Sequence, residues 1–158
     1  MVFLGLASGR YPFASTFGAA GYAELFLITF LANAGVAIPI PYLPVVVLAA
    51  TQLNPTLVAL CAGGAAALGE LSGYLLGVSA RTVLPAHPLL RRTQRVLDRG
   101  GDWLVLAIAF LPNPFTKLVG AAVGAQRRPL WRYLLLSFLG KSARFWLLAL
   151  GAAAFWPH

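Results

Sequence analysis

Acidic residues are scarce in this sequence. Only four of its 158 residues are Asp or Glu, against twelve Lys or Arg, two His and one Cys. The acidic set is Glu24, Glu70, Asp98 and Asp102. These groups are too dispersed to build a metal site or a hydrolytic triad, so we expect no catalytic residues, no metal and no cofactor. The single cysteine, Cys61, excludes an intramolecular disulfide and reads as a small packing residue.

Charge of either sign is also rare. Charged residues make up 10% of the chain and hydrophobic residues 59%, whereas roughly a quarter of a soluble domain is charged. This composition predicts one all-α integral membrane domain over residues 1–158. The net charge of +8 comes largely from loops that flank apolar blocks, so we expect no nucleic-acid partner. Residues 1–10 lack a basic stretch before their apolar run, and we expect no cleaved signal peptide there.

The first apolar block covers residues 18–50. As one straight helix it would be about 50 Å long, which overshoots about 30 Å of hydrocarbon. Pro39, Pro41 and Pro44 interrupt it, because each proline removes a backbone donor. We therefore predict a re-entrant helical hairpin over residues 18–52, turning at these prolines.

A second apolar segment is broken at its centre by Pro112, Asn113 and Pro114. Both of its flanks, residues 81–99 and 127–132, are rich in arginine, and short basic loops stay on the cytoplasmic side. A segment that crossed the bilayer would place one basic flank outside. We predict a second re-entrant hairpin over residues 102–126; the alternative is an ordinary kinked span with a snorkelling Lys117.

Two further blocks, residues 55–80 and 130–157, have the length and composition of transmembrane helices. A hairpin followed by a span therefore occurs twice, which suggests two opposed hairpins related as an inverted repeat. Residues 68–74 also align weakly with residues 139–145.

In this alignment, Glu70 of the first segment corresponds to Lys141 of the second. Each lies about 13–16 Å along its helix from a flanking arginine, hence at similar depth near the bilayer centre. Ionisable groups there are normally paired or face water, so we predict that Glu70 faces Lys141 or Arg144. The pair either holds the two helices together or forms a polar surface along which a charged headgroup crosses the membrane. The residues assigned to a lipid path are Glu70, Tyr74, Asn113, Lys117, Lys141 and Arg144.

Glycines recur at a spacing of four residues. The two stripes are Gly69, Gly73 and Gly77, and Gly120 and Gly124. Small residues at this spacing let helix backbones approach closely in lipid. We predict helix packing here, with a homo-oligomer interface as the alternative.

A basic stretch precedes the second hairpin, over residues 86–100. It is predicted to form an interfacial helix that ends at Gly100 and Gly101. Its apolar and basic positions alternate at helical spacing. Predicted toward lipid are Leu89, Leu90, Val96 and Leu97, and toward water Arg91, Arg92, Arg95 and Arg99. The arginines either attract anionic lipid headgroups or simply set topology.

Three motifs, taken in order, resemble the DedA superfamily, also called the VTT or SNARE-associated Golgi protein domain. They are IPIPYLP at residues 38–44, GAAALGELSGYLLG at 64–77, and FLPNP at 110–114 followed by GAAVG at 120–124. The resemblance covers roughly residues 20–150. It implies two re-entrant hairpins that meet in the membrane, each packed by a span, and roles in lipid movement: recycling of undecaprenyl phosphate, aminophospholipid flipping or scrambling.

The sequence departs from that family's pattern at two positions. Ala32 stands where the family typically has an acidic residue, and Ala109 replaces an arginine before Phe110, while Lys117 takes the place of a later basic residue. These changes put proton-coupled transport in doubt unless Glu24 or Glu70 serves instead. The chain looks like a small, divergent prokaryotic member in the cytoplasmic (inner) membrane.

The sequence thus favours a flippase or scramblase that moves an anionic phospholipid or polyprenyl phosphate, without enzyme chemistry. In this hypothesis Lys117, Lys141 and Arg144 neutralise the phosphate, and Glu70 positions them. The alternatives are a non-transporting membrane scaffold and an ion-coupled carrier of small solutes.

Overall fold

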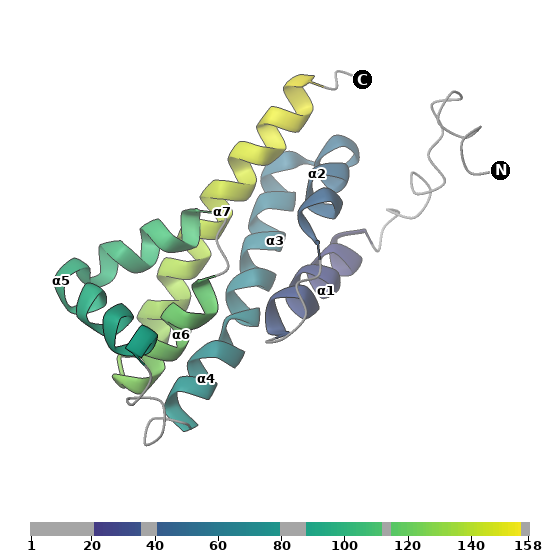
Figure 1. Cartoon of the computed structure of the whole chain (residues 1–158). Helices are drawn as coiled ribbons and strands as arrows, with labels where there is room; N and C mark the ends of the chain where they lie inside the picture. The colour runs from purple at the N-terminus through teal and green to yellow at the C-terminus, as the bar shows by residue number, and fades with distance from the viewer. Residues whose placement is uncertain (1–20, 36–40, 80–87, 112–114, 156–158) are drawn as a thin grey trace.

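The protein is described by a computed structural model for residues 21–35, 41–79, 88–111 and 115–155. The regular elements within these ranges are all helices, as expected (Figure 1). They are α1 (Gly21–Ala34), α2 (Leu43–Gln52), α3 (Pro55–Gly69), α4 (Leu71–Ser79), α5 (Pro88–Phe110), α6 (Thr116–Ala125) and α7 (Leu130–Phe155). Of the predicted turn residues, Pro39, Pro112, Asn113 and Pro114 lie outside the described ranges.

Within the described ranges, two segments are long and apolar enough to cross a membrane. They are Pro55–Ser79, which combines α3 and α4, and Leu130–Ala152 within α7. They coincide with the spans predicted from the sequence. Figure 1 shows them running in opposite directions, and α3 packs directly against α7. The other helices pack against this antiparallel pair.

The first of these segments is divided into two helices at Glu70. Asn54 starts it in the ordinary way, since its side chain accepts hydrogen bonds from the N–H groups of Thr56 and Leu57 at 3.0 and 3.2 Å and Pro55 occupies the first turn. However, α3 ends at Gly69 and α4 begins at Leu71. The N–H of Glu70 between them is shared by the carbonyl oxygens of Ala66 and Ala67, at 3.2 and 3.1 Å. The continuous helical pattern of the sequence did not reveal this local break.

Four further helices lie on either side of α3, with α1 and α2 on one side and α5 and α6 on the other (Figure 1). α1 packs against α3, α4 packs against α6, and α5 packs against both α6 and α7. Each predicted proline turn therefore has a helix before it and after it. Of the first turn, Pro41 is exposed just before α2, and Pro44 lies in the first turn of α2.

The predicted interfacial helix is the first arm of α5, which bends at Gly101. This residue has φ 55° and ψ −146°, a conformation that only glycine adopts without strain. The arginines of this arm that were expected to face water are exposed. Two of the leucines were assigned wrongly: Leu90 and Leu97 are buried, 1% and 0% exposed, and only Leu89 and Val96 face outward. The arm packs against the protein because its apolar stripe has α6 and α7 as partners.

Candidate functional site

A buried ion pair joins the two candidate spans at the break between α3 and α4. The ammonium nitrogen Nζ of Lys141 on α7 lies 2.7 Å from Oε1 of Glu70, and both side chains are 2% exposed. The ammonium also donates to Oδ1 of Asn33 at 3.0 Å and to the carbonyl oxygen of Ala66 at 3.1 Å. These three acceptors use all three donors of the lysine. Of the two partners predicted for Glu70, Lys141 or Arg144, the structure shows Lys141.

The second carboxylate oxygen of Glu70 also has a partner. The hydroxyl of Tyr133 donates to its Oε2 at 3.2 Å. The ring of Tyr133 stacks on that of Tyr74, with centroids 6.1 Å apart, and the Tyr74 hydroxyl donates to the carbonyl oxygen of Arg128 at 2.9 Å. Tyr74 therefore lies beyond Tyr133, toward the α6–α7 turn, and does not touch the ion pair itself.

Lys117 reaches the same region from α6. Its ammonium donates to the carbonyl oxygen of Asn33, to that of Gly69 at 3.2 Å and to the Ser72 hydroxyl at 2.8 Å. All three acceptors are neutral, and no carboxylate pairs with Lys117 among the described residues. The break at Glu70 supports this arrangement, because the carbonyl groups of Ala66 and Gly69 there both accept from lysines.

Arg144 lies one turn beyond Lys141 on α7. Its guanidinium donates to the Tyr42 hydroxyl at 3.0 Å and to the carbonyl oxygen of Leu111 at 3.4 Å. The side chain is buried, and its Nε has no acceptor in the part of the chain that the structure describes. Glu70 thus pairs with Lys141 and not with Arg144, which holds only neutral partners.

The charges of this cluster do not balance. Three cations, Lys117, Lys141 and Arg144, stand against one carboxylate, that of Glu70, which pairs with Lys141 alone. These four groups carry a net charge of about +2 at neutral pH. Excess charge away from water is costly unless a counter-ion or water compensates it. The cluster is therefore chemically suited to receive an anion.

Little space surrounds the ion pair in this conformation. A cavity of ≈ 10 Å³ borders Glu70, Tyr133 and Lys141, which is room for about one water molecule. A lipid headgroup requires far more, so the helices must separate to admit one.

Four cluster residues were missed by the sequence reasoning, namely Asn33, Tyr42, Ser72 and Tyr133. Asn33 carried a usable signal, since it is a polar side chain inside an apolar block near the expected depth of the hairpin tip. The tyrosines and the serine carried none, because such residues are common near helix ends. Asn113 lies outside the described residues.

The glycine stripes serve packing within the chain. A Cβ atom on Gly77 would lie 2.1 Å from the carbonyl oxygen of Ala121, and one on Gly124 would lie 2.1 Å from that of Tyr74. Gly73 and Gly120 line the same crossing of α4 and α6, and Gly69 lies against Asn33 of α1. The predicted packing role is confirmed. These surfaces are occupied by the protein's own helices.

A comparison with protein families matches residues 40–153 to the VTT domain. The chain belongs to the VTT-domain family. This is the DedA family domain, so the resemblance seen in the sequence is confirmed. The family is membrane-associated and consistent with a transporter-like role, in agreement with the two candidate spans. The match begins after α1, although Asn33 of α1 is part of the cluster.

No curated protein and no solved structure matches this VTT-domain chain. Among its described residues, no group of three His, Cys, Asp or Glu side chains is placed to hold a metal ion.

Proposed function

We propose that this VTT-domain protein moves a lipid with a phosphate group, either an anionic phospholipid or a polyprenyl phosphate, across the bilayer as a flippase or scramblase. The observation that carries the proposal is the excess positive charge of the cluster, in which Lys141 and Arg144 are buried and Lys117 is half-buried. Phosphate supplies the missing counter-charge and several strong acceptor oxygens. No covalent step is needed, and the membrane is the cytoplasmic membrane of a prokaryote.

The cations have different roles in this proposal. Lys141 already has a charged partner in Glu70, and that pair holds α3 and α7 together. Lys117 and Arg144 hold only neutral acceptors, which form weaker hydrogen bonds than an anion does. A phosphate is therefore expected to displace the partners of Lys117 and Arg144 first.

The helix arrangement supports the proposed topology. Two helices precede a long apolar segment twice along the chain, α1 and α2 before Pro55–Ser79 and α5 and α6 before Leu130–Ala152, as two re-entrant hairpins of an inverted repeat would require. In this arrangement the two hairpins enter the membrane from opposite sides, and their separation admits the headgroup.

The test is transbilayer movement of a fluorescent anionic phospholipid in liposomes that contain the purified protein. We expect movement with the wild-type protein and a loss of about tenfold or more in Lys117→Ala, since one charge-assisted hydrogen bond is worth about 1.5–3 kcal/mol. Arg95→Ala is the matched control, because it removes an exposed cation from the first arm of α5.

Equal movement in wild type, Lys117→Ala and Arg144→Ala would refute the assigned path. If folded wild-type protein moves neither an anionic phospholipid nor a polyprenyl phosphate, the transport proposal fails, and recovery of a stoichiometric partner would then favour a scaffold.

A further inference from the structure

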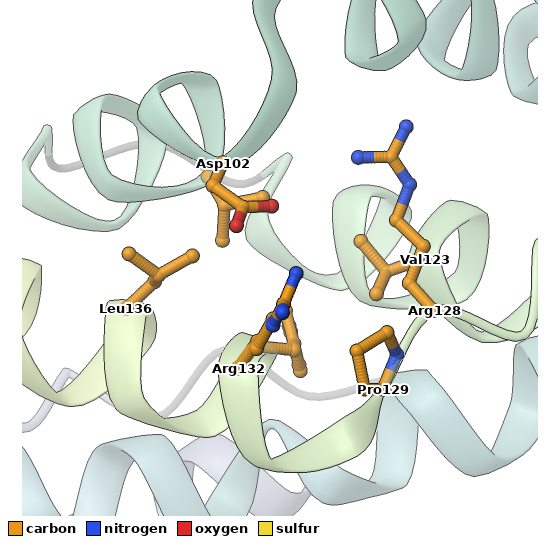
Figure 2. Close-up of a pocket in the computed structure, with 8 residues that line it drawn as sticks. Asp102, Val123, Arg128, Pro129, Arg132 and Leu136 are labelled. Atoms are coloured by element: carbon orange, nitrogen blue, oxygen red, sulfur yellow. The ribbon is translucent and has the colours of Figure 1, made fainter.

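A second, larger cavity opens beside the cluster, where α5, α6 and α7 meet. It has a volume of ≈ 220 Å³ and is called the outer cavity here. Figure 2 shows Asp102 on α5 and Arg132 on α7 pointing into it from opposite helices, while the guanidinium of Arg128 points away from its centre. The outer cavity is thus polar and has room for several water molecules.

The charges that face the outer cavity balance. Asp102 and Arg132 are both exposed and carry opposite charges, and Arg128 is engaged by Asp98 at 3.1 Å. A neutral lining does not attract an anion in preference to water. The outer cavity is therefore suited to be a water-filled entrance, whereas the excess positive charge lies deeper, in the cluster.

Exposed tryptophans flank the outer cavity. Trp103, next to Asp102, is 80% exposed, and Trp131, next to Arg132, is 63% exposed. Tryptophan side chains gather at the membrane–water interface. The pair indicates that the outer cavity opens at a water-facing edge of the protein, on the side of the basic arm of α5.

One polar side chain stands between the outer cavity and the cluster. Tyr133 is 3% exposed and lines both the outer cavity and the cavity of ≈ 10 Å³ beside Lys141. Val105 also borders both cavities, but it is shorter and has no polar group. Because the inner cavity holds about one water molecule, a larger solute reaches Lys141 by this route only if Tyr133 moves.

Three contacts hold Tyr133 in place. Its hydroxyl donates to Oε2 of Glu70 at 3.2 Å, and its ring stacks on that of Tyr74 with centroids 6.1 Å apart. Gly120 leaves space for the hydroxyl, since a Cβ atom there would lie 2.7 Å from the hydroxyl oxygen. A hydrogen bond to a charged group shifts an equilibrium by about tenfold or more, so the bond to Glu70 favours the closed position by a factor that rotation of the side chain can overcome.

We propose that Tyr133 is a gate between the outer cavity and the cluster. Its side chain closes the connection while it is bonded to Glu70, and its rotation into the outer cavity admits water and small hydrophilic anions to Lys141. This inference rests on the proposed function, in which the cluster receives an anion, and it names the side chain that controls access from the side of the basic arm.

Access to the cluster is measured through the reaction of a buried thiol. Ser137 lies one turn before Lys141 on α7, lines the inner cavity and not the outer one, and is 2% exposed. Ser137→Cys in a Cys61→Ala background therefore places a thiol behind the gate. The probe is a negatively charged methanethiosulfonate, which is too large for the inner cavity and reacts only when the gate opens. The full chain is studied in detergent micelles, so the reaction requires no lipid movement.

Two substitutions of Tyr133 are compared in this background. Tyr133→Phe keeps the ring and removes only the hydrogen bond to Glu70, so it should raise the reaction rate by about tenfold. Tyr133→Ala removes the ring as well and should raise the rate further. Leu136→Ala is the matched control on α7, because Leu136 lines the outer cavity and not the inner one, and it should leave the rate unchanged.

A third variant tests the route. Leu136→Trp added to Tyr133→Ala fills the outer cavity with a large side chain, so it should slow the reaction again. A rate that stays high in this double variant overturns the inference, because the reagent then arrives by another path.

The inference is also overturned if Tyr133→Phe reacts no faster than its parent and Tyr133→Ala no faster than Leu136→Ala. Thermal unfolding shows which variants are folded, and Tyr133→Phe, which removes one oxygen atom, decides the question if Tyr133→Ala does not fold. Access that depends on Tyr133 in a protein that moves no lipid supports the gate and refutes the proposed function. Lipid movement without such access does the reverse.

Discussion

At the scale of single residues, the buried pair of Glu70 and Lys141 differs in kind from the surface pair of Asp98 and Arg128. The buried pair is 2% exposed on both sides, whereas the side chains of Arg128 and Asp98 are 26% and 61% exposed. Water screens the surface pair and leaves it little net energy. Removal of one buried partner leaves an uncompensated charge without water.

We therefore expect Glu70→Gln or Lys141→Met alone to destabilise the protein by about 3–5 kcal/mol. The double variant should lose less than the sum of the two, because neither charge is stranded. Asp98→Asn should change the stability by about 1 kcal/mol or less.

Thermal unfolding in detergent micelles measures all four variants. Strictly additive losses in the double variant would show that the two side chains do not stabilise each other.

At the scale of helices, the crossing of α4 and α6 depends on glycine. Lys117 on α6 reaches the Gly69 carbonyl group and Ser72 only because α6 lies close to the α3–α4 segment. The close approach of α6 to the α3–α4 segment therefore also sets the position of the Lys117 ammonium group. Wider separation of these helices should move Lys117 out of the cluster.

Gly77→Ala tests this dependence. Its Cβ atom would lie 2.1 Å from the carbonyl oxygen of Ala121, and such overpacking costs about 1–3 kcal/mol. Gly151→Ala is the matched control on α7, where nothing lies within 4 Å of the added atom, and it should stabilise the helix by about 0.5–1 kcal/mol.

Both variants are compared by thermal unfolding and by lipid movement. A Gly77→Ala protein as stable and as active as Gly151→Ala would mean that the crossing tolerates wider spacing.

At the scale of the whole molecule, the proposed topology predicts which helix ends lie on the same side of the membrane. The candidate span Pro55–Ser79 separates Gln52 from the basic arm of α5. A re-entrant second hairpin returns the chain to its starting side, whereas a kinked span crosses. Residues on the two flanks of that hairpin distinguish the two cases.

We expect Arg99→Cys and Arg127→Cys, each in a Cys61→Ala background, to react with a membrane-impermeant maleimide from the same side. Gln52→Cys should react from the opposite side. All three positions are exposed. Labelling of Arg99→Cys and Arg127→Cys from opposite sides would establish a kinked span and exclude the hairpin.

The sequence by itself determined the class of the protein, its two candidate spans and the need of Glu70 for a basic partner on the last helix, either Lys141 or Arg144. These features follow from hydropathy and from distance along a helix, which are local properties of the chain. A charge that lies many turns from water needs a partner at equal depth, and few candidates were present.

The tertiary structure alone decided the partners of Lys117, the inward faces of Leu90 and Leu97, the break at Glu70 and the cavity lined by Asp102 and Arg132. Each depends on which helix faces which. In a chain this apolar, hydrophobicity does not distinguish a face that meets lipid from one that meets another helix. Only the packed arrangement of the helices settles that choice.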